Sequence, residues 1–399
     1  MNKKIKKRFI FYFSALFLVF SFFSCSENSE NRLEEFFIAS SAASQKKSFS
    51  YQSYEQFCHS LSRLQNRFPE IVLIESIGKS VEGRDIFAVI ISDFPSQDLE
   101  DEPGIRITSG IHGNEKIAPA FMLQFMEYLV SSYATDSEVK KIIDENYIAF
   151  IPIINPDGYV KDIRYNSNNK DLNRDFNDYV ANCSIFSQPE SCFLRDYKPG
   201  RFVCGISYHS GDYVISFPLG YTESSKYRSE HYELFLSVAK DYAIAGTEGT
   251  RFCDGICSVS KATDFTITGG DWYVVTGELS DWSYLEYGCI DITVEISKEK
   301  EPESNQSIQH TFELNKAGLL AFLQNAKNID LLKIKKRCRS KSGNQFWCLT
   351  NINTNLFFFH VRARKIQLNY ISASFCNFFC QIFPFTFVTP HCDNKCIEE

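Results

Sequence analysis

Short apolar runs that alternate with helical segments are the feature of this sequence that most restricts its fold. The apolar runs lie at residues 71–77, 86–91, 105–108, 147–154, 205–208, 214–217 and 290–297. Apolar side chains at helical spacing occupy residues 57–68, 118–131 and 314–325. Such alternation is typical of layered domains in which helices cover a buried sheet. The sequence therefore predicts an α/β fold over residues 51–330, with a mixed, mostly parallel twisted sheet flanked by helices.

Local signals predict how this domain begins. Ser53 precedes the first helical segment and Pro69 follows it, and these residue types are typical of the start and the end of a helix. The next two apolar runs are separated by the turn residues Val-Glu-Gly-Arg at 81–84, so we expect a β-hairpin there.

The first 24 residues have a different character. Five basic residues precede an apolar run at residues 9–23, which ends at Ser24 and Cys25. This pattern predicts a signal peptide over residues 1–24, because the run is too short to span a membrane. The small residue before Cys25 resembles a bacterial lipoprotein cleavage site, which implies an exported envelope lipoprotein, periplasmic or on the outer surface. Ordinary secretory cleavage nearby is the alternative, and the protein would then be secreted.

Composition adds expectations about the rest of the chain. Residues 25–50 are rich in Ser, Asn, Glu and Ala, so we expect a tether between the lipid anchor and the domain. The formal net charge is −7, and no basic patch favours a nucleic-acid partner. We expect a monomer that meets the membrane only through the lipid at Cys25. Fourteen cysteines in an exported chain predict disulfides, whose pairing the sequence leaves open.

Residues 331–399 form a tail that is rich in Cys and Phe and has no steady periodicity. It carries six of the fourteen cysteines. A cysteine-stapled module and a frame-shifted, non-native end of the reading frame are both compatible with this composition. The tail is therefore left unassigned.

The loop SGIHGNE is the first candidate for chemistry. It places His112 and Glu115 three residues apart, between a predicted strand and a predicted helix. A neutral imidazole and a carboxylate are suitable zinc ligands, and a tight turn can direct both at one point. Alone this signal is weak, because a polar surface loop can carry the same two residues.

Six further motifs follow this loop in a fixed order. They are INPDGY at 154–159, DLNRDF at 171–176, SYHSGDYVISFP at 207–218, GGDWY at 269–273, DWSYLEYGC at 281–289 and ITVEIS at 292–297. With this set, the chain resembles the zinc metallocarboxypeptidase family over about residues 50–325, and most closely its carboxypeptidase N/E-like branch. The resemblance implies the zinc carboxypeptidase fold and one Zn²⁺ ion as cofactor.

The resemblance also implies how the metal is held. Carried over residue by residue, it makes His112, Glu115 and His209 the zinc ligands. Three protein ligands leave a fourth position open for water, as a hydrolytic zinc site requires. Asp171 would accept a hydrogen bond from His112 and hold its tautomer.

Glu295 is the expected general base and acid. Ile292, Val294 and Ile296 share one face of its strand, so Glu295 points from the other face. In the implied mechanism zinc lowers the pKa of its water, and Glu295 takes the proton and later delivers it to the leaving amine. A solvated glutamate on an edge strand is the alternative.

The same resemblance implies residues that recognise the substrate. Asn173 and Arg174 match the clamp for the terminal carboxylate, a group that suits a guanidinium fork. Arg164 lies nine residues before Asn173, where the family carries the arginine that stabilises the oxyanion. Tyr273 matches the tyrosine that closes over bound substrate.

Three positions depart from the branch in the pocket for the terminal side chain. Gly220 stands eleven residues after His209, where basic-selective members carry an aspartate. Ser280 replaces a glutamine, and Glu278 replaces the second residue of a glycine pair. We therefore expect apolar or neutral C-terminal residues to be cleaved at least as well as Lys or Arg. If the Glu278 carboxylate turns into the pocket, basic residues are favoured instead.

The sequence thus predicts a zinc-dependent metallocarboxypeptidase that hydrolyses the C-terminal peptide bond of peptides or proteins. A peptidoglycan stem-peptide amidase of the same fold is one alternative, which would suit an envelope lipoprotein and which Gly220 favours slightly. An inactive, surface-binding lipoprotein is another, and the retained ligands and Glu295 argue against it.

Overall fold

A computed structural model of the chain describes residues 51–97, 102–245, 259–331, 336–339, 345–350, 356–362 and 365–368. The chain divides into two units, Met1–Ser50 and Tyr51–Glu399. The signal peptide, the lipid anchor at Cys25 and the tether that the sequence predicts lie outside the described residues. They stay predictions.

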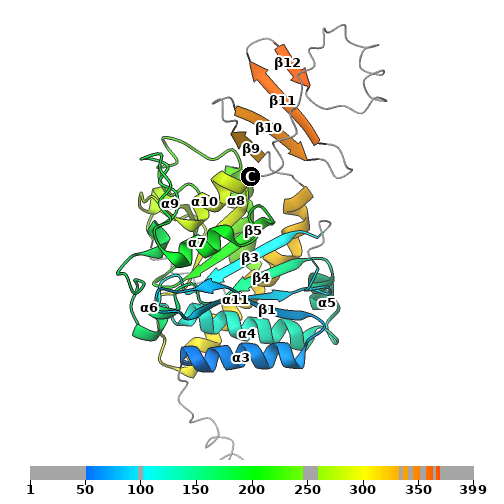
Figure 1. Cartoon of the computed structure of the whole chain (residues 1–399), viewed down its shortest axis with the longest axis vertical. Helices are drawn as coiled ribbons and strands as arrows, with labels where there is room; N and C mark the ends of the chain where they lie inside the picture. The colour runs from blue at the N-terminus through cyan, green and yellow to red at the C-terminus, as the bar shows by residue number, and fades with distance from the viewer. Residues whose placement is uncertain are drawn as a thin grey trace, which may run out of the picture. The chain divides into compact units, whose positions relative to one another are not determined.

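Residues 51–331 are built around an eight-stranded sheet (Figure 1). Its strands are β1 (Val72–Lys79), β2 (Asp85–Ile91), β3 (Gly104–Ser109), β4 (Tyr147–Ile151), β5 (Phe202–His209), β6 (Asp212–Phe217), β7 (Thr266–Thr268) and β8 (Ile290–Ser297). Their order across the sheet is β1-β2-β4-β3-β5-β8-β6-β7. The central strands β4, β3, β5 and β8 are parallel, whereas β1, β2 and β6 introduce the antiparallel pairs. This confirms the predicted mixed, mostly parallel sheet.

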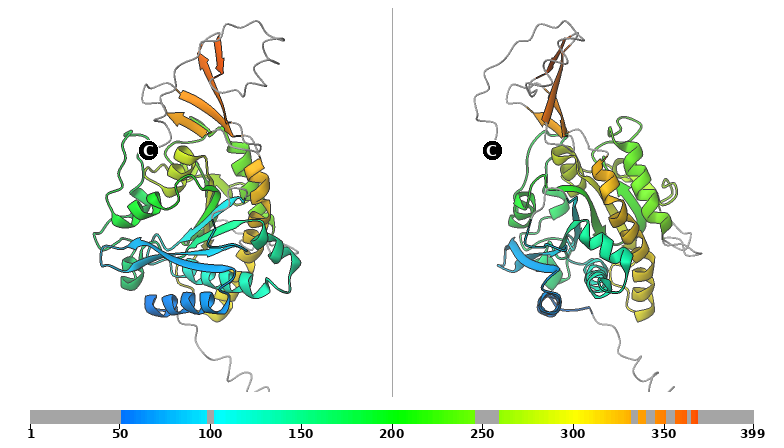
Figure 2. Two further views of the ribbon diagram at one scale, coloured as in Figure 1. Left: turned by 45° about the vertical axis from the view of Figure 1, so that its right-hand side comes forward. Right: turned by 90° about the vertical axis from the view of Figure 1, so that its right-hand side faces the viewer.

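Helices cover both faces of this sheet (Figure 2). They are α3 (Tyr54–Arg67), α4 (Ile117–Ser132), α5 (Ser137–Asp144), α6 (Pro156–Lys161), α7 (Pro189–Asp196), α8 (Tyr232–Ala245), α9 (Gly269–Trp272), α10 (Leu279–Tyr287) and α11 (Asn305–Leu331). Buried side chains of α3, α4, α5, α8 and α11 pack on one face of the sheet, in the larger core. Leu194 of α7 and Leu279 and Trp282 of α10 pack on the other face, whereas Tyr284 of α10 belongs to the larger core.

Helix α3 and the hairpin after it form where the local signals predict them. The Ser53 hydroxyl accepts a hydrogen bond from the Gln56 N–H at 3.2 Å, and the Gln56 side chain accepts one from the Ser53 N–H at 2.9 Å. This reciprocal cap satisfies two N–H groups at the start of the helix. The helix ends at Arg67, before Pro69, and β1 and β2 pair antiparallel. Both predictions are confirmed.

Other boundaries differ from the expectation. The apolar run at 147–154 is a strand only as far as Ile151, because Pro152 has no N–H to donate to a ladder. Helix α11 extends beyond residues 314–325 at both ends. The apolar patterns do not predict β7 or any of the helices α5 to α10. Of these, α5 and α7 are each only eight residues long and offer little periodicity.

The tail contains a second sheet. Strands β9 (Lys336–Arg339), β10 (Gln345–Thr350), β11 (Leu356–Arg362) and β12 (Lys365–Leu368) pair antiparallel in the order β12-β11-β10-β9. The sequence leaves this tail unassigned, so the strands are a finding of the structure. Elsewhere, Cys58, Cys183, Cys192 and Cys289 are free thiols, and the expected disulfides therefore do not involve them.

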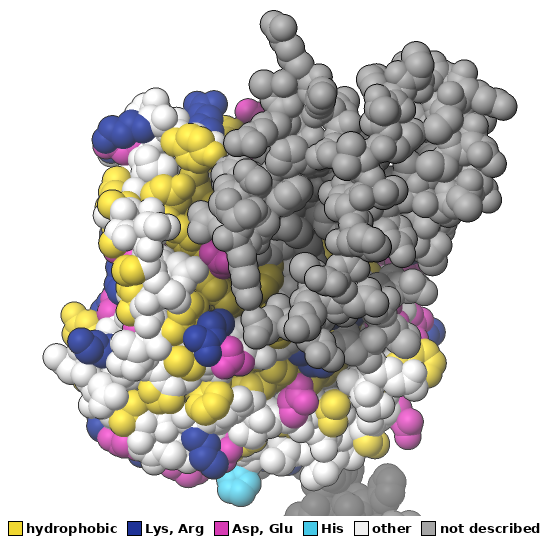
Figure 3. All heavy atoms as spheres, turned by 45° about the horizontal axis from the view of Figure 1, so that its top comes forward, with side chains coloured by type: hydrophobic (Ala, Val, Ile, Leu, Met, Phe, Trp, Pro, Cys, Tyr) yellow, Lys and Arg dark blue, Asp and Glu magenta, His cyan; other side chains and the backbone are white. Residues whose placement is uncertain are grey.

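One face of the described residues mixes side chains of different kinds. On the face shown in Figure 3, basic and acidic side chains lie among one another, with apolar side chains scattered between them. No helix in the described part of the chain combines the length and the apolar character that crossing a bilayer needs.

Phe121 of α4 is buried in the larger core, where its ring contacts the rings of Phe125, Tyr208 and Phe312. We expect Phe121→Ala to lower the free energy of unfolding by about 3–5 kcal/mol, because it removes buried apolar surface and leaves a cavity. Phe94→Ala is the matched control, since Phe94 is half exposed, and its effect should stay within about 0.5 kcal/mol. Urea titration measures both. Equal losses for the two variants would contradict the assignment of Phe121 to the core.

Candidate active site

The candidate active site lies at the carboxyl ends of three neighbouring parallel strands. Strand β3 ends at Ser109, and the turn that follows carries His112 and Glu115. His209 is the last residue of β5 and is the register partner of Glu295 on β8. Because parallel strands end at one edge of the sheet, residues far apart in the chain meet there.

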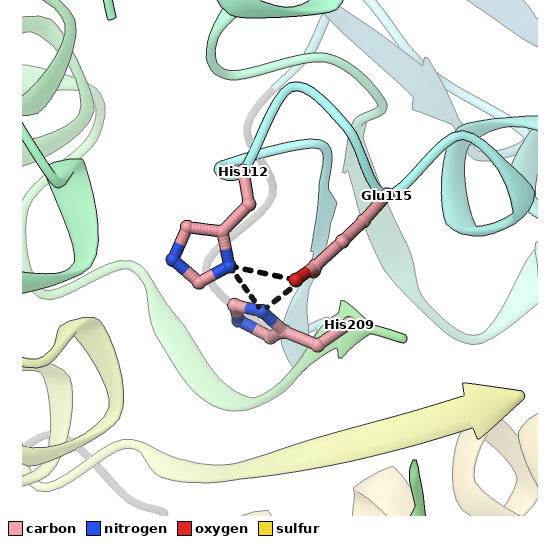
Figure 4. A group of neighbouring side chains, drawn as sticks. All are labelled: His112, Glu115 and His209. Atoms are coloured by element: carbon pink, nitrogen blue, oxygen red, sulfur yellow. Dashed lines mark hydrogen bonds and ion pairs between the residues drawn. The ribbon is translucent and has the colours of Figure 1, made fainter. Parts of the chain in front are cut away.

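His112, Glu115 and His209 converge on one point (Figure 4). The Glu115 carboxylate lies 3.0 Å from His112 Nδ1 and 3.1 Å from His209 Nδ1. The ligand atoms all lie within 4.8 Å of one another, and all three side chains are buried. Within the described residues, this is the group of His, Cys, Asp and Glu side chains that could hold a metal ion. Two imidazole nitrogens and a carboxylate oxygen form a donor set that suits Zn²⁺.

Close backbone packing holds the turn that carries two of these residues. A Cβ at Gly113 would overlap the backbone of Gly158, so only glycine permits this approach. The Asn155 side chain donates to the carbonyl oxygens of Ile111 at 3.4 Å and Arg164 at 3.3 Å. The INPDGY motif therefore ties the His112 turn to the loop that carries Arg164.

The pKa shifts of Glu115 and His209 suit a cation. Burial raises the pKa of Glu115, but the neighbouring His112 and His209 outweigh burial and bring that pKa well below its usual range. Burial lowers the pKa of His209, against the opposing effect of Glu115, and so favours the neutral imidazole that binds metal. Lys300 approaches from the loop after β8, with its ammonium 3.2 Å from Glu115.

Asp171 connects the cluster to Arg164. Its Oδ1 lies 3.1 Å from His112 Nε2, and its Oδ2 accepts a hydrogen bond from Arg164 Nε at 2.9 Å. Burial raises the pKa of Asp171, but His112 and Arg164 outweigh burial and bring it well below its usual range. Arg164 Nη1 lies 3.3 Å from His112 Nδ1, which places the guanidinium beside the cluster.

Glu295 faces the same cavity from β8, a strand that lies between β5 and β6 and is not an edge. Ile292, Val294 and Ile296 face the core on the other side of the sheet, as their alternation predicts. Glu295 Oε2 is buried without a hydrogen-bond partner in the protein. Burial, and then the negative charge of Glu115, raise the pKa of Glu295 well above its usual range. Such a group is typical of a carboxylate used in catalysis.

One cavity brings the expected substrate residues and the metal-ligand group together. It is lined by His112, Glu115, Arg164, Asn173, Arg174, His209, Ser216, Gly269, Trp272, Tyr273, Glu278, Thr293 and Glu295. The Asn173 side chain is held by a hydrogen bond from the Leu279 N–H at 3.0 Å. Arg174 Nη1 donates to the Asn173 carbonyl at 2.6 Å. Tyr273 is 46% exposed, so its ring lies at the surface of the cavity.

The three departures from the branch lie in different surroundings. Glu278 lines the cavity, and its carboxylate lies against Gly220, where a Cβ would overlap Glu278 Oε2. Ser280 is buried on α10 and is not among the lining residues. Asp281 accepts hydrogen bonds from the N–H groups of Gly220 at 2.9 Å and Tyr221 at 3.1 Å. Burial, and then the charge of Asp281, raise the pKa of Glu278 to about 8.

Several cavity residues were not predicted from the sequence. Ser216 and Thr293 are register partners on β6 and β8, and polar residues within apolar strands are a signal that could have found them. Trp272 adjoins Tyr273 in the GGDWY motif. Lys300 follows β8 outside every motif, and no sequence signal marks it.

Comparison with known proteins agrees with this geometry. Residues 57–328, more than half of the chain, match the zinc carboxypeptidase family. The chain belongs to that family. The prediction made from the ordered motifs is therefore confirmed, and similar relatives include carboxypeptidases D, M, N and Z.

Two zinc carboxypeptidase relatives show the extent of the similarity. The chain is 30% identical over 295 residues to carboxypeptidase D of Homo sapiens, an alignment that covers 70% of this chain and 21% of the relative. It is 29% identical over 292 residues to carboxypeptidase M of Mus musculus, which covers 69% of this chain and 66% of the relative. The matched part thus spans about a fifth of the length of carboxypeptidase D.

Solved structures confirm the zinc carboxypeptidase fold. Bovine thrombin-activatable fibrinolysis inhibitor, in complex with tick carboxypeptidase inhibitor, superposes with a TM-score of 0.57 at 23% identity, over 70% of this chain and 98% of that one. Carboxypeptidase A from Helicoverpa armigera superposes with a TM-score of 0.55 at 23% identity, over 75% of this chain and 82% of that one.

The contact of Asp171 with His112 leads to a prediction about metal affinity. Asp171→Asn keeps the shape of the side chain but removes the charge that orients the imidazole, so we expect Zn²⁺ affinity to fall about 10–100-fold. Competition with a chromogenic chelator measures the affinity. Asp241→Asn, at an exposed position on α8, is the matched control and should bind Zn²⁺ as the wild type does. Unchanged affinity in Asp171→Asn would contradict an orienting role.

Proposed function

We propose that this protein is a zinc-dependent metallocarboxypeptidase that removes the C-terminal residue of peptides or proteins. The observation that carries the proposal is the meeting of a His-Glu-His group with Glu295 in one cavity. Arg164 and Arg174 line the same cavity. A metal-binding group, a proton acceptor and cations for a carboxylate are the parts that such a reaction needs.

The His112, Glu115 and His209 side chains fit a Zn²⁺ ion. They are buried and converge on one point, and a cation there would offset the charge of the buried Glu115 carboxylate. When bound, the ion would lower the pKa of a water molecule and polarise the scissile carbonyl. Asp171 would keep His112 in the tautomer whose Nδ1 is free to bind, since the carboxylate accepts from Nε2.

Glu295 supplies the proton transfers in this proposal. Its unpartnered Oε2 would take a proton from the attacking water and return it to the amine of the leaving residue. The rigid position of Glu295 on an internal strand supports this role, because general catalysis requires fixed geometry.

The cations around the cavity would hold the substrate. Arg174 and Asn173 would bind the terminal carboxylate, and Arg164 would stabilise the negative charge that develops on the carbonyl oxygen. Arg164 is oriented for this by Asp171. Tyr273 would close over the bound residue. If export and lipidation at Cys25 occur as predicted, the substrates are peptide C-termini in the cell envelope.

A peptide with a free C-terminus should lose its last residue, whereas the same peptide with a C-terminal amide should stay intact, because it lacks the carboxylate that Arg174 would bind. Mass spectrometry of the products checks this. A strong chelator should abolish hydrolysis, and added Zn²⁺ should restore it. Hydrolysis that persists after verified loss of metal would contradict the proposal. Cleavage confined to peptidoglycan stem peptides would favour the amidase alternative.

Glu295→Gln should reduce kcat by roughly 10²–10⁴-fold, because the amide cannot accept the proton. Zinc content, measured by atomic absorption, should stay unchanged, since Glu295 is not one of the three proposed ligands. Glu127→Gln, at an exposed position on α4, is the matched control and should keep wild-type kcat. A Glu295→Gln enzyme with near-normal kcat would place the base elsewhere.

A further inference from the structure

The side-chain pocket of the proposed site contains a carboxylate at an unusual place. Ser216 and Thr293, register partners on β6 and β8, line the cavity together with Gly269 and Glu278. The sequence has glycine at 220, where the branch carries its charge for basic residues. Position 220 therefore contributes no side chain to this part of the cavity.

Glu278 fills the space that a side chain at 220 would take. A Cβ built on Gly220 would overlap Glu278 Oε2, and it would lie 3.2 Å from Glu278 Cδ. A Cβ on Gly269 would lie 3.7 Å from the same oxygen. The absence of a side chain at 220 thus makes room for a carboxylate that comes from the segment before α10, and a Cβ at 269 would only touch it.

The charges around Glu278 are unevenly compensated. Asp281 beside it accepts from two backbone N–H groups, which stabilise its negative charge, although burial outweighs them and raises the pKa of Asp281 to about 6. Glu278 Oε1 lies 3.6 Å from Arg174 Nη1, the cation proposed to bind the substrate carboxylate. Burial and the charge of Asp281 disfavour an ionised Glu278, as its raised pKa shows. Because this holds even with Arg174 nearby, Glu278 needs a further cation in the pocket to be fully charged.

We propose that Glu278 is the counter-ion for the cationic side chain of a C-terminal Lys or Arg: a cation that enters the pocket adds its charge to that of Arg174 and brings the Glu278 carboxyl into its charged form. This proposal rests on the proposed function. When the substrate carboxylate binds Arg174, less of the positive charge of Arg174 is available to offset the negative charges of Glu278 and Asp281. A cationic side chain restores the compensation, whereas an apolar side chain leaves two neighbouring carboxyl groups in a desolvated pocket.

This proposal reverses the preference expected from the loss of the aspartate alone. The sequence leaves two outcomes open, according to the direction of the Glu278 side chain. Its carboxylate lies in the cavity against Gly220, which favours basic residues. The carboxylate that selects basic residues would thus come from position 278, whereas in basic-selective members of the branch it comes from position 220.

Matched pairs of ligands isolate the charge from the shape. We expect the zinc-loaded protein to bind arginine at least about tenfold more tightly than citrulline, its neutral counterpart, in isothermal calorimetry. Peptides ending in Lys should show a similar advantage in kcat/KM over peptides ending in norleucine. In Glu278→Gln both ratios should fall to within about threefold. Glu303→Gln, exposed on the surface, should keep the wild-type ratios.

A relocated carboxylate provides a second variant. Gly220→Asp combined with Glu278→Gly returns the charge to position 220 and should recover the preference that Glu278→Gln loses. Circular dichroism and zinc content establish that each variant is folded. If the double variant does not fold, Glu278→Gln against Glu303→Gln decides the question alone.

The binding measurements and the turnover measurements together distinguish a failure of the Glu278 role from a failure of the proposed carboxypeptidase activity. Hydrolysis without discrimination between Lys and norleucine overturns the role of Glu278 and leaves the carboxypeptidase standing. Discrimination that survives in Glu278→Gln also overturns it. Glu278-dependent preference for arginine over citrulline without hydrolysis of any peptide supports the counter-ion and overturns the carboxypeptidase.

Discussion

Parallel pairing of β3, β5 and β8 is the constraint on which the rest of this site depends. Each strand ends at the same edge of the sheet, so the turn with His112, the terminal residue His209 and Glu295 are brought to one point. The hydrophobic side chains that alternate with them lie in the core on the opposite face. Burial of one face of the strands thereby fixes the direction of the polar groups on the other.

Buried charges in this edge of the sheet are arranged so that each lies beside an opposite charge or a proton donor. Glu115 lies between His112 and His209, and Asp171 lies between His112 and Arg164. Removal of a carboxylate from water is costly, and these contacts offset that cost. Glu295 is the exception, since one of its oxygens is buried without a partner. Glu115 and Asp171 are thus compensated, whereas Glu295 keeps one buried oxygen without a partner.

The pocket beside this network brings together a carboxylate and a glycine from two different segments of the chain. Gly220 and Glu278 are far apart in sequence, yet the Glu278 carboxylate occupies the space that a side chain at position 220 would fill. Arg174 lies close to that carboxylate and also lines the cavity. The ability of this pocket to bind a proton or a cation therefore depends on Glu278 and Arg174 together.

Motif order in the sequence was sufficient to predict the family, and the alternation of apolar runs was sufficient to predict the type of sheet. These signals are local: a capping serine, a strand of alternating residues or a histidine after a strand carries its information in a few adjacent positions. Helix α3, strand β8 and the position of Glu295 were predictable for this reason. The short helices α5 and α7 were not, because eight residues carry too little periodicity.

The sequence by itself determined the metal-ligand candidates, since its ordered motifs resemble the zinc metallocarboxypeptidase family and that resemblance implies His112, Glu115 and His209 as ligands. Only the tertiary structure decided how Glu278 is oriented, that Ser280 is buried away from the cavity, and that Lys300 approaches Glu115. These contacts join segments whose separation depends on the packing of loops and helices around the sheet. Side-chain direction in such loops follows no periodicity, so no pattern in the sequence encodes it.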